Sequence, residues 1–290
     1  MRMLFYTSGI VVTLGMAVMY PALAAEQEPP VMPAAEAAKE QPARLLSAFF
    51  GLDNALPFRI NRVCFGGSGK DGMPVVFSHT LDADTLQPED FNIVTRSGEA
   101  SMPKCVTLRP AQDPGENRTV LMIGEFGSAD DDPPASVQIV GEVLSDGTPS
   151  VDFNGARVDV TPLAAGPSLV LAKALTEDEW TTKTRSTSCP KDVKQVVRVT
   201  WNGGVRLPNG DDPGDTERQL YRVTVERADG PSDEISPVAL ADLKDRDNNH
   251  LLCLDTADPA IAVSFPGGHL VDPNMDLNPD TRVAVSRGGN

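Results

Sequence analysis

Residues 74–99, PVVFSHTLDADTLQPEDFNIVTRSGE, decide the fold class of this chain. Two short apolar runs, Pro74–Ser78 and Phe91–Thr95, lie on either side of an acidic segment that contains a proline. Both runs are rich in β-branched and aromatic residues, and such runs between turn residues are typical of β-strands. The stretch therefore predicts two short strands joined by a polar crossing.

The same pattern of short apolar runs between turn residues extends outward along the chain. In the first half it predicts seven strands, a density typical of an antiparallel sandwich: Ile60–Phe65, Pro74–Ser78, Phe91–Thr95, Cys105–Arg109, Thr119–Phe126, Ser136–Val140 and Ala156–Val160. After Gly166 and Pro167 a second series is predicted: Leu169–Leu175, Val193–Trp201, Leu220–Glu226, Pro237–Leu243, His250–Leu254, Ala260–Phe265 and Thr281–Ser286. The alternative for Pro237–Leu243 is a helical turn capped by Ser236.

No long helical pattern alternates with these runs, so a parallel α/β sheet is not expected. The predicted fold class is all-β, with two antiparallel β-sandwich domains that divide near residue 164. The two series also resemble each other. VVFS, DFNIVTRSGEA and KCVTL in the first half correspond in order to VRVTW, LYRVTVERADG and SPVAL in the second. We interpret this as two copies of one plan, with chance similarity between two β-rich halves as the alternative.

Residues 74–126 resemble the bacterial immunoglobulin-like domains of exported, surface-layer and adhesive proteins. The matching residues are Phe77-Ser78, Leu81-Asp82 and Asp90-Phe91, which correspond to that family's Phe-Ser strand, acidic Leu-Asp loop and Asp-Phe strand. The resemblance covers about 50 residues, mainly at core and turn positions. It implies an immunoglobulin-like sandwich for the first half and says little about function, and the second half matches the pattern less well. With the internal repeat, the expected fold is two immunoglobulin-like sandwiches.

The N-terminus is typical of an export signal. Arg2 precedes an apolar stretch, and Ala22-Leu23-Ala24 offers small residues for signal peptidase. We expect a signal peptide at 1–24, a disordered Pro-rich linker at 25–43 and sandwich domains at 44–163 and 164–290. An uncleaved membrane anchor is the alternative for the first segment. Within the first domain, the apolar spacing of Arg44–Leu52 predicts a short helical lid.

Charge excludes several classes of partner. The chain has 290 residues, with 41 Asp plus Glu against 25 Lys plus Arg, and a formal net charge of −16. Removing residues 1–24, which contain one base and no acid, makes this −17. So acidic a chain is not expected to bind nucleic acid, and the same charge disfavours docking on anionic lipid. After signal cleavage no further membrane span is expected, and the predicted location is periplasmic or secreted.

The four cysteines, Cys64, Cys105, Cys189 and Cys253, are therefore expected to form two disulfides in an oxidising compartment. Three pairings are possible. We favour Cys64–Cys105 with Cys189–Cys253, because each bridge then closes a loop inside one domain.

Two acidic segments near the C-terminus are candidate calcium sites. Carboxylate and amide oxygens alternate along both segments, and such oxygens can turn toward one hard cation. The candidate ligands are Asp242, Asp245, Asp247, Asn249 and Asp255 in the first segment, and Asp272, Asn274 and Asp276 in the second. The alternative is a pair of solvated turns in which these side chains bond their own backbone.

Other chemistry is poorly supported by the sequence. His79, His250 and His269 have no metal-binding spacing, and the glycine-rich stretch Phe65–Gly72 lacks the spacing of a phosphate loop. There is no G-x-S-x-G elbow, so no catalytic residue and no organic cofactor are assigned. We expect a non-catalytic binding or envelope-structural module whose partner is a protein or glycan. The alternatives are an extracytoplasmic hydrolase with a site between the domains and a periplasmic metal carrier.

Overall fold

The computed structural model describes residues 42–111, 113–181 and 186–287. The chain is all-β, with 38% strand and 10% helix. The predicted signal peptide and nearly all of the predicted linker lie outside the described residues. The described residues belong to one compact unit. Within the described residues, no helix has the length and apolar character needed to cross a membrane.

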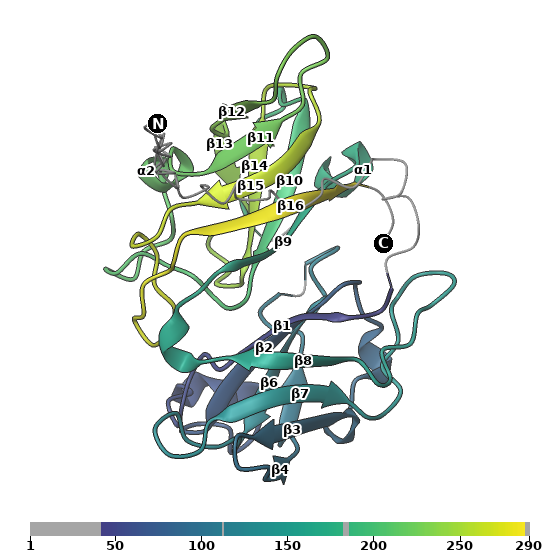
Figure 1. The fold of residues 1–290 in the computed structure, drawn as a ribbon, viewed down its shortest axis with the longest axis vertical. Coiled ribbons are helices and arrows are strands. Elements are labelled where there is room, and N and C mark those ends of the chain that lie inside the picture. The colour runs from purple at the N-terminus through teal and green to yellow at the C-terminus, as the bar shows by residue number, and fades with distance from the viewer. Residues whose placement is uncertain (1–41, 112, 182–185, 288–290) are drawn as a thin grey trace, which may run out of the picture. The chain divides into compact units, whose positions relative to one another are not determined.

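The first half contains a curled eight-stranded sheet in the order β4-β3-β7-β8-β1-β2-β6-β5 (Figure 1). Its strands are β1 (Leu45–Phe49), β2 (Asp71–Phe77), β3 (Phe91–Thr95), β4 (Ala100–Ser101), β5 (Cys105–Thr107), β6 (Thr119–Gly124), β7 (Pro134–Ile139) and β8 (Arg157–Thr161). Short 3-10 helices lie at η1 (Phe58–Arg62), η2 (Ala83–Thr85), η3 (Pro88–Asp90) and η4 (Leu163–Ala165). β1 and β8 pair in parallel, and the other pairs of this sheet are antiparallel.

The second half repeats this order element by element, as β12-β11-β15-β16-β9-β10-β14-β13, with β9 and β16 as its parallel pair (Figure 1). Its strands are β9 (Leu169–Ala174), β10 (Gln195–Trp201), β11 (Arg222–Val225), β12 (Asp233–Ile235), β13 (Ala239–Ala241), β14 (Asn249–Leu254), β15 (Ala260–Phe265) and β16 (Thr281–Arg287). Two short helices, α1 (Glu177–Thr181) and α2 (Asp215–Arg218), lie between strands. The three predicted pairs of matching segments fall on β2 and β10, β3 and β11, and β5 and β13, so the two-copy interpretation is confirmed.

Each half encloses its own hydrophobic core. In β3 the burial alternates, so that Phe91 and Ile93 point into the core while the residues between them are half-buried. Phe77 packs edge-to-face on Phe153, with ring centroids 4.9 Å apart. Phe77 of β2 also lies edge-to-face with Phe91 of β3, with ring centroids 6.5 Å apart, so the curled sheet closes around its own apolar face.

The second core is centred on Trp201, Tyr221 and Phe265, all of them buried. Because the indole and phenol are buried, their polar atoms need partners. Trp201 Nε1 donates to Tyr221 Oη at 3.2 Å, and Tyr221 Oη lies 2.9 Å from His250 Nδ1. The polar atoms of this large apolar core are therefore satisfied internally.

Two local predictions are wrong. Residues Leu45–Phe49, expected in a helical lid, form strand β1 in the interior of the sheet, and residues Ile60–Phe65, expected as a strand, overlap the 3-10 helix η1. Apolar runs as short as these do not distinguish a helix from a strand by their periodicity. Leu45–Phe49 is a strand because it pairs with β2 and β8. The alternative of a helical turn after Ser236 is also wrong, because Ala239–Ala241 pairs with β14.

The structure has both disulfides, in the pairing that the sequence favours. Cys64 is bonded to Cys105 and Cys189 to Cys253. The first ties the β1–β2 loop to β5, and the second ties the segment before β10 to β14. Each bridge therefore lies within one half of the chain.

Candidate metal centre

Two equivalent loops of the two halves meet at a cluster of buried acids. Asp113 and Glu116 lie in the β5–β6 loop, and Asp242, Asp245 and Asp247 lie in the β13–β14 loop. One carboxylate oxygen from each of Asp113, Asp242 and Asp245 lies within 4.8 Å of the others. Within the described residues, this is the one group of three or more metal-ligating side chains that approach so closely. We call these five acids the acidic cluster.

The β5–β6 loop presents its acids through a tight turn. Glu116 N donates to Asp113 O at 2.9 Å, with Pro114 and Gly115 between them and Gly115 at a φ of 82°. Proline second and a left-handed glycine third are the preferences of a type II turn. A Cβ on Gly115 would lie 2.5 Å from Nη1 of Arg198, so glycine also makes room for this guanidinium. The turn thus places an acid at each end, beside Arg198.

The β13–β14 loop has an unusual backbone. Asp242, Lys244 and Arg246 have φ values of 61°, 78° and 67°, although none is glycine. Each such residue costs roughly 1–3 kcal/mol and persists where the surroundings enforce it. Lys244 and Arg246 are exposed, whereas Asp242 and Asp247 are buried. The strained backbone therefore turns the acids of this loop inward and its bases outward.

Each aspartate of this loop uses one carboxylate oxygen locally. Asp242 Oδ1 accepts from Ser186 Oγ at 2.7 Å, Asp245 Oδ1 accepts from the Asp247 backbone N at 3.3 Å, and Asp247 Oδ1 accepts from the Asn249 backbone N at 2.7 Å. The Oδ2 atoms of all three are buried without a hydrogen-bond partner. Each aspartate therefore keeps one buried oxygen free.

Glu116 is the most deeply buried acid of the cluster. Its side chain is 0% exposed, and neither of its carboxylate oxygens has a hydrogen-bond partner. Arg198 Nη2 lies 3.9 Å from Glu116 Oε1, while the same guanidinium donates to Gly115 O at 2.9 Å and Pro114 O at 3.2 Å. Another buried cation, Arg118, interacts with Arg198, but the acids within its electrostatic reach are Asp146 and Glu179. Among the described residues Arg198 is therefore the cation beside Glu116, and it shares its hydrogen bonds with the turn.

Burial and mutual repulsion disfavour ionisation of Glu116, Asp245 and Asp247. Burial, the proximity of Asp242 and the charge of Asp247 raise the pKa of Glu116 to about 11. Burial and the charge of Asp245 raise the pKa of Asp247 to about 7. The pKa of Asp245 is raised by burial and then by Asp242. Without a further cation, Glu116 therefore keeps near pH 7 a proton that it would release in water.

The remaining predicted ligands lie apart from this arrangement. Asn249, at the start of β14, accepts from Thr200 Oγ1 at 2.7 Å through Oδ1. Asp255 is exposed and follows the last residue of β14, whereas Asp247 precedes the first. The first predicted segment thus contributes three of its five candidate residues to the acidic cluster.

The second predicted segment folds as a turn bonded to itself. Asp276 N donates to Asp272 Oδ1 at 2.9 Å, Met275 N donates to Asp272 O at 3.1 Å, and Asn274 Nδ2 donates to Asp276 Oδ2 at 2.7 Å. Asp272 is fully buried, and desolvation raises its pKa to about 6. These bonds are those of the alternative, in which the side chains bond their own backbone.

Three residues of the centre were not predicted from sequence: Asp113, Glu116 and Arg198. The sequence Asp113-Pro114-Gly115-Glu116 does indicate a turn with an acid at each end. Nothing in the sequence indicates that this turn lies beside residues 242–247, because that contact depends on how the two halves meet.

The histidines do not form a metal site in the described part of the chain. His79 Nδ1 lies 2.9 Å from Ser78 Oγ, and His250 is hydrogen-bonded to Tyr221. Burial lowers the pKa of His250 to about 4, so it is neutral near pH 7. Within the described residues, no histidine belongs to a group of three metal-ligating side chains.

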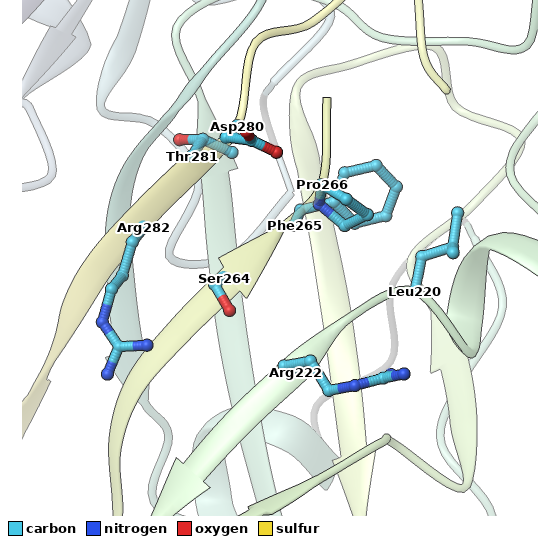
Figure 2. A pocket seen from close by; sticks show the side chains of 8 residues that line it. All are labelled: Leu220, Arg222, Ser264, Phe265, Pro266, Asp280, Thr281 and Arg282. Carbon is cyan, nitrogen blue, oxygen red and sulfur yellow. The ribbon is translucent and has the colours of Figure 1, made fainter. Parts of the chain in front are cut away.

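A shallow, open groove lies on β11, β15 and β16 of the second half (Figure 2). It is lined by Leu220, Arg222, Ser264, Phe265, Pro266, Asp280, Thr281 and Arg282. Figure 2 shows Ser264 between the two arginines, as expected from its pairing with both in the sheet. Arg222 donates to Ser236 Oγ at 2.8 Å and Arg282 to Thr224 Oγ1 at 3.1 Å, so both guanidinium groups have partners within the protein.

Comparison of the chain with models of known protein families and with curated proteins found no match. The functional interpretation therefore depends on the geometry and chemistry of the chain itself.

Proposed function

We propose that this chain is an exported, non-catalytic module of two immunoglobulin-like β-sandwiches, and that calcium at the acidic cluster stabilises the contact between them. Strand order supports the first part. β1-β2-β6-β5 and β4-β3-β7-β8 correspond to the ABED sheet and the C′CFG sheet of immunoglobulin domains. The second half has the corresponding order. Such modules commonly act through exposed loops carried by a rigid scaffold.

The unpartnered oxygens carry the calcium proposal. Both oxygens of Glu116 and one from each of Asp242, Asp245 and Asp247 are buried in one cluster without a hydrogen-bond donor. Buried carboxylates are normally paired, hydrogen-bonded or bound to a metal. A cation bound where oxygens of Asp113, Asp242 and Asp245 come within 4.8 Å of one another would offset the charge that these buried groups bring together.

The donor set favours calcium among common cations. All donors are carboxylate oxygens, which suits hard ions and not zinc or copper, for which nitrogen and sulfur ligands are usual. Magnesium usually retains several waters, whereas calcium takes six to eight oxygen ligands in a flexible geometry. Glu116 is fully buried, so a cation that gives up its water readily fits better. In this role Asp113 and Glu116 would bind from one half, and Asp242, Asp245 and Asp247 from the other.

Export is supported by cysteine usage. Both disulfides join residues within one half, and none of the four cysteines is free. Structural disulfides of this kind persist in oxidising compartments. We propose that the mature protein is periplasmic or secreted, with a protein or glycan as its partner.

Thermal unfolding of the mature chain in EDTA and then in millimolar calcium tests the proposal. At a calcium concentration of 100 times Kd, the expected stabilisation is about 2.7 kcal/mol, or a rise in Tm of about 5–10 °C for a chain of this size. Asp242→Asn should remove most of this rise. Asp255→Asn is the matched control, because Asp255 is exposed and should leave the rise intact.

No rise in Tm with calcium contradicts the proposal, and so does an equal rise in the Asp242→Asn variant. Magnesium at the same concentration is expected to give a smaller rise, since a site with little room for water does not suit its hydration shell.

A further inference from the structure

The β1–β2 loop carries large apolar side chains in full contact with solvent. Phe58 is 82% exposed and Phe65 is 90% exposed, while Val63 between them is 37% exposed. Met102, in the neighbouring β4–β5 loop, is 59% exposed. Single exposed apolar residues are ordinary, but a group of large ones indicates an interaction surface.

Unpaired cations accompany these side chains. Arg59 and Arg62, three residues apart in the 3-10 helix η1, lie one above the other on one side of that helix. Both are exposed, and so is Lys104, and none of the three pairs with an acid among the described residues. Residues 54–70 contain three bases and no acid, in a chain with 41 acids and 25 bases. We call Phe58, Arg59, Arg62, Phe65 and Lys104 the basic-aromatic tip.

The two segments of the tip are held side by side. The Cys64–Cys105 disulfide joins the residues next to Phe65 and Lys104. A Cβ on Gly66 would lie 3.3 Å from Cε of Lys104, which shows how closely the segments approach. Phe65 and Lys104 therefore lie close together although they come from two loops.

The loop also has a fixed conformation. Leu56 N donates to Lys70 O at 3.0 Å, and Gly69 N donates to Leu56 O at 2.8 Å, so the two ends of the loop are paired. Leu56 and Cys64 are buried in a small cluster with Ile123. The loop therefore has its own internal apolar contacts, and Phe58 and Phe65 stand outside them. Burying these two rings requires something beyond the described chain.

We propose that the basic-aromatic tip docks on an anionic lipid surface. Exposed fractions above four-fifths mean that each ring protrudes from the protein, and a protruding ring can enter the deformable boundary between lipid headgroups and acyl chains. The guanidinium and ammonium groups beside the rings would contact lipid phosphates. The strongly acidic remainder of the chain is repelled by the same lipid surface. Docking is therefore restricted to the orientation in which the basic-aromatic tip faces the membrane.

Vesicle flotation of the mature chain tests this inference, with vesicles of phosphatidylglycerol and phosphatidylcholine compared with phosphatidylcholine alone. EDTA is present throughout, so that calcium cannot bridge acidic residues to lipid. We expect binding to the anionic vesicles that falls by about tenfold or more in Arg59→Gln/Arg62→Gln, since each base near such a surface contributes a several-fold gain in affinity. Phe58→Ser/Phe65→Ser should abolish binding.

The matched control is Met275→Ser/Leu277→Ser, which removes two exposed apolar side chains from the second half and should leave binding unchanged. All these substitutions are at exposed positions, so the Tm of each variant should match that of the unmodified chain. Absence of binding to anionic vesicles overturns the inference, as does equal binding by the tip variants. Binding of a polyglutamate peptide through the same residues, without vesicle binding, would assign the tip to an acidic protein partner instead. These outcomes are independent of the calcium response.

Discussion

Replacing Arg198 with methionine should destabilise the apo protein more than any other single change of charge in the described residues. Arg198 is 5% exposed, and its guanidinium contacts both carbonyl oxygens of the β5–β6 turn and the carboxyl of Glu116. Methionine has a similar length and fills much of the same space, so the change removes charge and hydrogen bonds with little loss of volume. What remains is the buried Glu116 without the guanidinium that lies beside it.

The hydrogen bonds of the guanidinium set the size of the effect. The pKa of Glu116 is raised to about 11, so this carboxyl is protonated near pH 7 and contributes little attraction to Arg198. Arg198 donates to Gly115 O at 2.9 Å and to Pro114 O at 3.2 Å, and a hydrogen bond from a charged donor contributes about 1.5–3 kcal/mol. Loss of both should cost about 3–6 kcal/mol, which corresponds to a fall in Tm of about 6–24 °C for a chain of this size.

Unfolding in EDTA, followed by tryptophan fluorescence, measures this effect, since Trp201 is fully buried in the second core. Arg227→Met is the matched control. Arg227 also contacts two carboxylates, Asp233 and Asp258, but on the surface, where an ion pair contributes little. A fall in Tm of less than about 2 °C for Arg198→Met, or one no larger than that of Arg227→Met, would refute the assignment of Arg198 as the charge partner of the cluster. Calcium should restore part of the lost stability, because it supplies the missing positive charge.

Two further outcomes are expected. Gly203→Ala should destabilise the chain by about 1–3 kcal/mol in urea unfolding. The Cβ of the alanine would lie 2.9 Å from the ring of Phe49, which is fully buried and cannot move aside. An unchanged unfolding midpoint would contradict this. Asp272→Asn should stabilise the chain in EDTA at pH 7.5 by about 1–2 kcal/mol. The raised pKa of Asp272 means that the native state loses stability as the pH rises from about 4 to 6, and asparagine avoids this loss. The gain should disappear at pH 4, and a gain that is independent of pH would count against this explanation.

The alternating strands could be predicted from sequence because their cause is local. Phe91–Thr95 and Ala260–Phe265 coincide with the observed strands, since a β-branched, aromatic run between turn residues has few alternatives. Leu45–Phe49 could not be predicted in the same way. Its residues are buried on both faces, because Leu45 and Ala48 pack in the first core while Phe49 lies beside Gly203 of the second half. A strand that is covered on both faces shows no polar alternation.

Only the part of the candidate site that lies in one continuous segment, residues 242–247, could be predicted from the sequence. Alternating oxygens singled out Asp245, Asp247 and Asn249, with Asp242 close by in sequence. The same alternation at Asp272–Asp276 gives a turn bonded to itself. The difference is set by what lies opposite each segment, and 126 residues separate Glu116 from Asp242. A pattern of ligands along one segment cannot indicate which distant loop completes the set.

The halves of this chain meet through equivalent parts. The β5–β6 and β13–β14 loops correspond in the repeat, and so do β1 and β9, which also lie in contact. Two copies of one subunit meet in this way in an isologous dimer. Here the seven residues between β8 and β9 tether the copies, and a short tether gives an effective concentration in the millimolar range. A contact with a Kd of about 1 mM would then be closed about half of the time, and a cation that contributes about 2.7 kcal/mol would raise this to about 99%. The tether thus makes the open and closed arrangements of the pair sensitive to a modest amount of binding energy, so that the calcium concentration around the protein would set the balance between them.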